Sequence, residues 1–522
     1  MNIGRIGQLL DHCTSKCHPV NLSTFLPTRL IDVGHDAFAV PRLVLSSDVH
    51  QTEQTRYAAL SYCWGDEEEA KSQFKTEIAS LEDRCVALSS ELMTSTTKDA
   101  IALARAIGIR YLWIDALCII QDDEGDWSHE SSQMNLIYRH AFVTFCSLSS
   151  DSCHEGFLNR APTIAIPFQS TIQKAIKGFY SIRARSIAGF HVDRKKDMRD
   201  HALSKWGTRG WTYQEQVMST RFLLFGSLRM HFTCDTCQWA EGDEAPKDRS
   251  EMGISIQITR FKDKRISIRQ LYEYWNQIVQ GYCHRSVTFD KDRLPAIAGI
   301  ARMIGEALQD QYLAGLWRGN LQCGLAWYSF DDGIGTLSRG LEAYLQNIRE
   351  RNYVAPSWSW AALSAMEYEP TPDTCLFEES TIVDVSTKTI SEDLYGQVSV
   401  GVLRIRAKMA RMPNRIPVHE GRYWKDFWIP SFEGDVDGIY VGTDWLHKDK
   451  EAGLENLVVM LLHRIEKDDK DKAPSLMALL LHPANELKHY LRVGVMKSSG
   501  NSGYREMRAW FEDSQEETIC II

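Results

Sequence analysis

The chain lacks long apolar runs and any excess of positive charge. No stretch of its 522 residues approaches the roughly 18 consecutive apolar residues that a membrane-spanning helix needs. The opening stretch MNIGRIGQLLDHCTSKCHPV is too polar for the apolar core of a secretory signal. The formal net charge of -10 argues against a phosphate-binding surface, which needs clustered Lys and Arg. We therefore predict neither a membrane partner nor a nucleic-acid partner.

The signatures of several enzyme classes are also missing. GIGTLSRG (333–340) does not have the spacing of a dinucleotide-binding GxGxxG loop, and HESSQ (129–133) lacks the second histidine of a zinc protease. Neither a GxSxG elbow nor a phosphate-binding Walker loop is found. These absences argue against hydride transfer, metalloprotease, serine-hydrolase and NTPase activities.

Cysteine, in contrast, is plentiful: the chain has 13, an odd number, without an export signal. We therefore predict reduced thiols and a cytoplasmic location. Metal-ligating residues cluster in two places: His12, Cys13, Cys17 and His18 near the start, and His231, Cys234 and Cys237 later. Together they could supply four zinc ligands, but neither group has the spacing of a zinc finger by itself. Free thiols are favoured, and no metal or other cofactor is predicted.

The clearest structural unit lies at 96–120, TTKDAIALARAIGIRYLWIDALCII. Apolar residues recur on one helical face as far as Ile107, and Gly108 is placed as a helix stop. The residues Tyr111 to Asp115 then predict a buried strand. A helix that leads into a buried strand is half of an α/β repeat.

Similar units flank this one. Residues 27–34 and 41–47 predict a hairpin, and strands are expected at 57–64, 141–148 and 221–225. Asp126 is expected to cap the helix between two of these strands, with a stripe formed by Trp127, Ser131, Met134 and Tyr138. The alternation predicts a parallel sheet covered by helices, and ligands of such sheets bind beyond the carboxyl ends of the strands.

Three blocks of this first half resemble a known family. YAALSYCWGD (57–66), the stretch from YLWIDALC to FCSL (111–148) and RGWTYQEQVMSTRFLLF (209–225) are similar, in this order, to the conserved blocks of the fungal heterokaryon-incompatibility (HET) domain. Shorter similarities follow in LPAIAGIA, AGLW, PSWSW and ICII. The resemblance implies a role in fungal non-self recognition, in which HET domains trigger programmed cell death.

The HET domain is in turn distantly similar to TIR-type domains, some of which cleave NAD with a glutamate in a Trp-Cys-x-x-Glu pattern. Trp211 and Glu215 have that spacing here, with Thr212 in place of the cysteine. The resemblance thus implies a parallel-sheet, TIR-like α/β fold and an activity like that of an NAD glycohydrolase. NAD or a related nucleotide would be the substrate, with an unidentified protein partner or a homo-oligomer for signalling.

Glu215 and Asp115 are the candidate catalytic residues. Cleavage of the bond between nicotinamide and ribose passes through an oxocarbenium-like state, which a nearby carboxylate stabilises. We expect Glu215 to face a solvent-reachable crevice together with Asp115, which would hold a ribose hydroxyl. The alternatives are that Glu215 pairs with Arg209 or Arg221, and that Asp115 caps the next turn.

Five further residues are predicted to line the same substrate site: Tyr62, Trp64, Asp66, Arg209 and Trp211. Indole faces can stack on nicotinamide or adenine, although a tryptophan in the position of Trp64 is more often a core residue. Two other functions stay open. The HET surface could signal by assembly without catalysis, or the scaffold could serve a small-molecule biosynthetic enzyme.

The predicted organisation has four parts. Residues 1–26 form an N-terminal extension, and 27–264 form the HET domain with an insertion at about 150–203. Residues 265–352 are a helical connecting region, and 353–522 are a mostly β C-terminal domain, because stretches such as GQVSVGVLRIRAKMARM alternate in polarity.

Overall fold

The computed structural model describes most of the chain. The described residues are 3–18, 25–36, 38–50, 55–159, 164–182, 204–227, 229–248, 266–329, 340–350, 353–363, 366–368, 376–412, 419–420, 427–431, 434–445, 454, 456–466, 474–484 and 487–522. They divide into two compact units, Met1–Lys262 and Asp263–Ile522. The predicted insertion lies partly outside the described residues, and its described part includes the hairpin β6 (Ile164–Gln169) and β7 (Lys177–Ile182).

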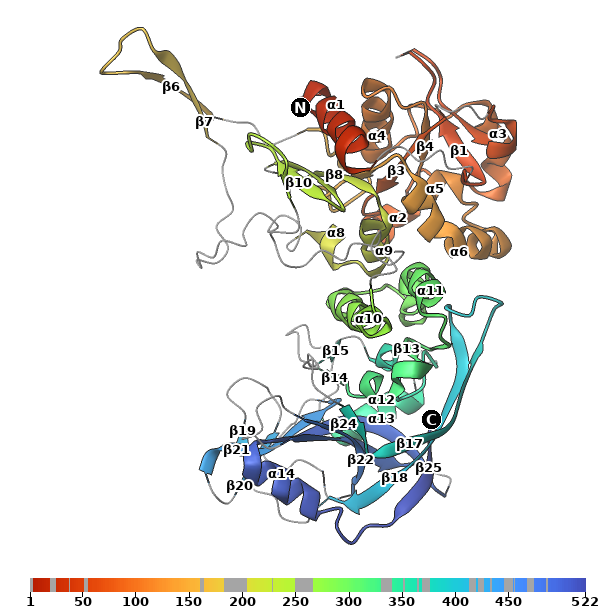
Figure 1. The fold of residues 1–522 in the computed structure, drawn as a ribbon. Coiled ribbons are helices and arrows are strands. Elements are labelled where there is room, and N and C mark those ends of the chain that lie inside the picture. Colours follow the sequence, from red (N-terminus) through yellow and green to blue (C-terminus); the bar gives the residue numbers. More distant parts are fainter. Residues whose placement is uncertain are drawn as a thin grey trace. The chain divides into compact units, whose positions relative to one another are not determined.

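A mixed sheet forms the centre of the first unit (Figure 1). In the described part of this unit, nine strands pair in the order β11-β10-β9-β8-β5-β3-β4-β1-β2. Their bounds are β1 Arg29–Asp32, β2 Arg42–Leu45, β3 Tyr57–Ser61, β4 Tyr111–Trp113, β5 Val143–Cys146, β8 Arg221–Phe225, β9 Met230–Cys234, β10 Cys237–Ala240 and β11 Lys247–Asp248.

The predicted parallel sheet is only the middle of this sheet. Strands β4, β3, β5 and β8 are parallel neighbours, whereas β1, β2 and β9 to β11 join them antiparallel. The reason is connection length, because β1–β2 and β8–β9–β10 are joined by short turns that permit only antiparallel pairing. Along the chain, β4 is added on one side of β3, and β5 and β8 on the other. Such a reversal of strand order marks the edge where ligands bind in doubly wound sheets.

Helices connect the parallel strands as the sequence indicates. Helix α4 (Ser95–Ala106) links β3 to β4, and α6 (Glu124–His140) links β4 to β5. The short helices α8 (Lys205–Thr208) and α9 (Gly210–Met218) lead into β8. Figure 1 shows α4 and α6 on opposite sides of β3 and β4. Among the described residues, this unit also has the helices α1 Ile3–His12, α2 Glu67–Lys71, α3 Leu81–Val86 and α5 Asp115–Cys118.

Two local predictions near α6 are wrong. Asp123, not Asp126, caps the helix by accepting hydrogen bonds from the backbone N–H groups of Gly125 and Asp126. Asp126 lies one turn inside, where its carboxylate pairs with Arg29 at 2.5 Å. Trp127 is exposed and is not part of the buried stripe. The buried face of α6 contains Glu130, Met134 and Tyr138 instead.

The second unit is mainly β. In its described part, ten strands form one sheet and further strands pair in twos. The helices are α10 Ile268–Cys283, α11 Pro295–Leu308, α12 Leu321–Gly324, α13 Leu341–Glu350 and α14 Gly500–Ala509. The strands are β12 Tyr312–Leu313, β13 Leu316–Trp317, β14 Tyr328–Ser329, β15 Met366–Glu367, β16 Leu376–Glu378, β17 Ser380–Thr389, β18 Val398–Arg411, β19 His419–Glu420, β20 Phe427–Ser431, β21 Gly434–Thr443, β22 Val458–Ile465, β23 Ser475–Pro483, β24 His489–Ser499 and β25 Glu516–Ile521.

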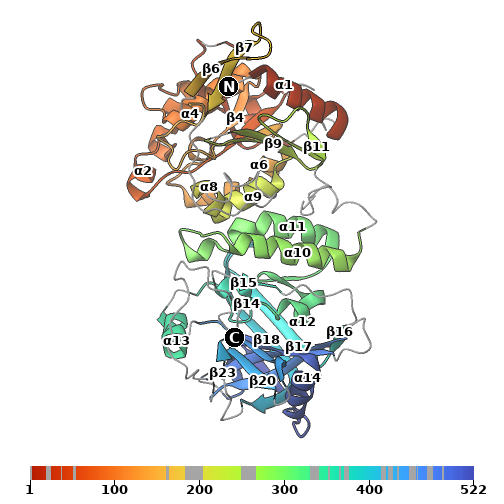
Figure 2. The ribbon, with the colours of Figure 1, turned by 90° about the vertical axis from the view of Figure 1, so that its left-hand side faces the viewer.

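Helices α10 and α11 lie side by side within this second unit (Figure 2). Tryptophan indoles organise the core beside them: the Nε1 atoms of Trp275 and Trp360 both donate to the Gly315 carbonyl oxygen, at 2.9 and 2.8 Å. The backbone N–H of Ser357 donates to the carbonyl oxygen of Ile522 at 3.1 Å. The segments AGLW, PSWSW and ICII therefore act here as packing elements of one core.

Candidate functional site

Glu215 lies at the centre of the candidate site. It is on α9, and its carboxylate accepts a hydrogen bond from the hydroxyl of Ser61, the last residue of β3. The side chain is 7% exposed, so the open presentation expected from the sequence is wrong. The cause is α9 itself, which brings the RGWTYQE segment against the sheet and buries five of its residues, Gly210 and Thr212 to Glu215.

Burial also changes the acidity of Glu215. Loss of water around the carboxyl group raises its pKa to about 7, and the nearby charge of Asp115 contributes in the same direction. The hydrogen bond from Ser61 and the charge of Arg209 act against this rise. Near neutral pH the group is therefore divided between its acid and carboxylate forms, which suits a residue that exchanges protons.

Asp115 and Trp64 come from two neighbouring strand ends. The Trp64 indole Nε1 donates to a carboxylate oxygen of Asp115 at 3.0 Å, and the other oxygen accepts from the backbone N–H of Ala116 at 2.7 Å. Burial raises the pKa of Asp115, and these two donors lower it. Asp115 begins the short helix α5 instead of ending a strand, because β4 stops at Trp113. The cap position of α5 is Ile114, which makes no side-chain cap hydrogen bond, so capping by Asp115 stays a prediction.

Arg209 and Tyr62 complete the group. A guanidinium nitrogen of Arg209 donates to the carbonyl oxygen of Tyr62 at 2.8 Å, which fixes the start of α9 against the end of β3. The Tyr62 hydroxyl is buried and accepts from the side-chain amide of Gln73 at 2.5 Å. Burial raises the pKa of Tyr62 well above its usual range. Trp64, Asp115 and Arg209 are half-buried, and the charges of Asp115 and Arg209 act on Glu215.

Two predicted site residues lie further out. Trp211 packs edge-on against Trp127 of α6, with ring centroids 6.4 Å apart. Asp66 is exposed and caps α2, where its carboxylate accepts from the backbone N–H of Glu69 at 2.9 Å. The six residues Ser61, Tyr62, Trp64, Asp115, Arg209 and Glu215 are from here on called the acid cluster.

Ser61 and Trp206 belong to the site but were not among the predicted residues. The indole of Trp206 donates to the Ser61 oxygen at 2.7 Å, while the Ser61 hydroxyl donates to Glu215. Trp206 is itself fully buried against Phe222. A signal was present, because Ser61 is a polar residue at the end of a strand whose other residues are apolar and buried. Buried hydroxyls in such positions need a partner.

Gly65 holds the loop that carries Trp64 beside this cluster. Its φ of +111° is unfavourable for other residues, and a Cβ atom would lie 2.3 Å from a carboxylate oxygen of Glu69. We expect Gly65→Ala to lower the free energy of unfolding by about 2–3 kcal/mol, through backbone strain and loss of the α2 capping box. Urea unfolding of the full chain measures this change.

Gly108→Ala is the matched control for that experiment. Gly108 also has a positive φ, of +72°, but no atom lies within 4 Å of an added Cβ. It should therefore show only the backbone strain, about 1 kcal/mol. Equal losses in the two variants would contradict the role assigned to the crowded Gly65 turn.

The comparison with protein families gives a match in this part of the chain. Residues 57–215 match the family model described as Heterokaryon incompatibility protein (HET). This segment is called the HET region below. It begins with β3 and ends at Glu215, so it contains the whole acid cluster. The resemblance is confirmed for these residues, while AGLW, PSWSW and ICII lie outside the match. No curated protein and no solved structure matches the chain.

The similarity to TIR-type domains stays a prediction.

In the part of the chain that the structure describes, no helix combines the length and apolar character needed to cross a bilayer. The groups of metal-ligating atoms found among the described residues do not include Glu215 or Asp115; they lie instead around Cys17.

Proposed function

We propose that the HET region cleaves the N-glycosidic bond of NAD or a related nucleotide, as the effector step of non-self recognition and cell death. The observation that carries the proposal is Glu215, a buried carboxyl group with a pKa raised to about 7, at the reversal point of a doubly wound sheet. Asp115 lies close enough for its charge to act on Glu215.

Cleavage of the bond between nicotinamide and ribose requires few catalytic groups from the protein. The nicotinamide of NAD carries a positive charge, so when its bond to the ribose carbon breaks, the bonding electrons neutralise it and no proton donor is needed. The ionised Glu215 would stabilise the positive charge that develops on the ribose. Water then adds to that carbon and loses a proton to Glu215, for which a carboxylate with a pKa near 7 is a better base than an ordinary one.

The half-buried residues would bind the rest of the substrate. Asp115 is held by Trp64 and by its own turn, so its orientation is fixed before a ligand arrives. It can accept a hydrogen bond from a ribose hydroxyl. The partly exposed indole of Trp64 offers a flat apolar face to nicotinamide or adenine. Entry past Trp64, Asp115 and Arg209 is required, since Glu215 itself is buried.

The test is release of nicotinamide from NAD by the purified full chain. We expect turnover in the wild type that rises with pH through about 7, because the ionised form of Glu215 is the active one. Glu215→Gln should lower turnover by roughly 10²–10⁴-fold. The matched control is Glu124→Gln, which changes an exposed carboxylate on α6. No release by the wild type, even when the chain is forced to assemble, would refute the proposal.

One observation favours a second function, signalling by assembly without catalysis. The burial of Glu215 and its hydrogen bond with Ser61 suit a carboxyl group that holds α9 on the sheet. In that case, toxicity on expression would persist in Glu215→Gln, provided that the variant folds. Loss of toxicity together with loss of nicotinamide release would instead support the enzymatic function.

A further inference from the structure

Four cysteines from the beginning and the end of the sequence of the first unit lie close together in the structure. Cys13 and Cys17 occupy a π-helical turn that continues α1, and Cys234 and Cys237 flank the turn between β9 and β10. The pairs are 220 residues apart in sequence, yet Cys17 Sγ lies 3.8 Å from Cys237 Sγ. Cys234 Sγ lies 3.5 Å from Cys237 Sγ. These four residues are called the thiol cluster.

Two of the sulfur–sulfur separations are close to those of a tetrahedral metal site. In zinc sites the metal–sulfur distance is about 2.3 Å, so two sulfur ligands of a tetrahedron lie about 3.8 Å apart. The sulfur atoms of Cys13, Cys17 and Cys234 are all within 4.8 Å of one another. A disulfide would need a sulfur–sulfur distance of about 2.05 Å, so the separations of 3.8 and 3.5 Å do not correspond to disulfide bonds.

The backbone around Cys234 adds a second argument. The N–H of Cys237 donates to Cys234 Sγ at 3.3 Å, so the Cys-x-x-Cys turn directs an amide at its own sulfur. A donor of this kind stabilises negative charge on a thiolate, which is the form that binds metals. Arg221, whose guanidinium donates to the His18 carbonyl oxygen at 2.5 Å, supplies a positive charge nearby.

We propose that Cys13, Cys17, Cys234 and Cys237 bind one structural Zn²⁺ ion, which joins the N-terminal helix to the β9–β10 hairpin. Zinc is the divalent metal that most often occupies tetrahedral sites with sulfur ligands, and the spacings Cys-x-x-x-Cys and Cys-x-x-Cys are typical of them. The sequence favoured free thiols because neither group has a zinc-finger spacing by itself and nothing placed residue 17 beside residue 237.

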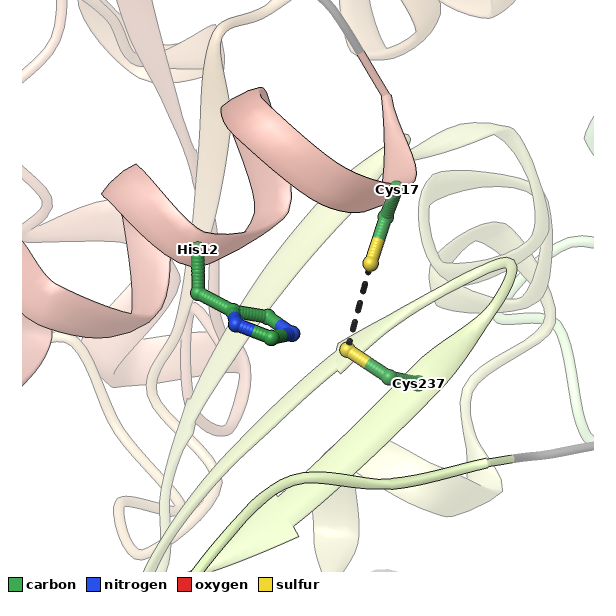
Figure 3. A group of neighbouring side chains, drawn as sticks. All are labelled: His12, Cys17 and Cys237. Atoms are coloured by element: carbon green, nitrogen blue, oxygen red, sulfur yellow. Dashed lines mark hydrogen bonds between the residues drawn. The ribbon is translucent and has the colours of Figure 1, made fainter.

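His12 is the competitor for the fourth position. Figure 3 shows its ring beside Cys17 and Cys237, and a ring nitrogen lies within 4.8 Å of both sulfur atoms. Cys13 is assigned instead because it is fully buried and its sulfur lies within 4.8 Å of those of Cys17 and Cys234, whereas His12 is exposed. Other contacts already hold the helix here, including the Arg5 guanidinium over the Trp239 ring and Thr236 Oγ1 beside His18 Nε2. The metal would add a rigid cross-link to them.

The test begins with the wild-type full chain, purified with reducing agent and without a metal-affinity tag. Elemental analysis should find about one zinc per chain, and X-ray absorption should give metal–sulfur distances of about 2.3 Å. Replacement of zinc by Co²⁺ should produce the visible bands of tetrahedral cobalt with thiolate charge transfer. Removal of zinc by a strong chelator should lower the melting temperature and expose four additional thiols to alkylation.

Variants then test the ligand assignment. Cys17→Ser and Cys234→Ser should lose the zinc, whereas Cys85→Ser, at an exposed cysteine of α3, should keep it. Cys13→Ser should lose zinc and His12→Ala should retain it; the reverse result would overturn the assignment of Cys13. Wild-type protein without stoichiometric zinc, with bound iron, or with a disulfide among these cysteines would overturn the zinc proposal. None of these outcomes depends on NAD cleavage.

Discussion

Glu215→Gln is expected to raise the free energy of unfolding at pH 8 by up to about 3 kcal/mol, even though it removes the central residue of the candidate site. The folded-state pKa of this carboxyl group is about 7, against 4.5 for an ordinary glutamate. Above pH 7 the folded chain must keep a buried negative charge that water solvates better in the unfolded chain. Glutamine has nearly the same shape and carries no charge.

The pH dependence gives the sign of this effect. Because the folded pKa is raised, the contribution of Glu215 to stability is fully present below about pH 4.5 and is lost as the pH rises through 7. The stabilisation by Glu215→Gln should therefore be absent near pH 4.5 and complete near pH 8. Urea unfolding of both proteins across this range measures it, with the exposed Glu124→Gln as control.

The same experiment shows whether Glu215 serves the activity or the stability of the protein. A variant that is more stable and inactive would show that the buried charge is kept for function at a cost in stability. A variant that is less stable at pH 8 would show that Ser61 and Arg209 together make the ionised carboxylate a net stabilising group. That outcome would favour signalling by assembly.

Arg492→Met should destabilise the second unit by about 3–5 kcal/mol, the largest loss that we expect from a single substitution. Arg492 and Asp444 are both fully buried, and a guanidinium nitrogen of Arg492 lies 2.7 Å from an Asp444 oxygen. Arg492 also donates to the Trp327 carbonyl oxygen and stacks on the Trp327 ring, with its Cζ atom 3.3 Å from the centroid. Without the arginine, Asp444 would remain as an unpaired buried acid.

Two further variants give this prediction its control. In Arg492→Met with Asp444→Leu both charged groups are absent, and much of the lost stability should return. Arg508→Met removes a partly exposed pair with Glu379, at 3.1 Å, and should cost less than about 1 kcal/mol. Thermal unfolding followed by circular dichroism compares the four proteins. A double variant that is as unstable as Arg492→Met would contradict the explanation by an unpaired charge.

The structure explains why different parts of the candidate site were predictable to different degrees. Asp115 was found because it follows a buried strand, and that strand could be recognised from local apolar residues alone. Ser61 was missed because its importance depends on Glu215, 154 residues away. Trp211 and Glu215 have the tryptophan-to-glutamate spacing of TIR-type enzymes, but the Trp211 ring packs on Trp127 of another helix. Such pairings are fixed only when the elements pack.

By itself, the sequence determined the local elements of this protein. The β1–β2 hairpin, the helix ending before Gly108 and the strands β3, β5 and β8 follow from periodicity and turn residues, which act over a few residues. Tertiary structure alone decided the mixed strand order, the burial of Glu215 and the meeting of Cys17 with Cys237. These features depend on contacts between distant segments, whose geometry no local pattern encodes.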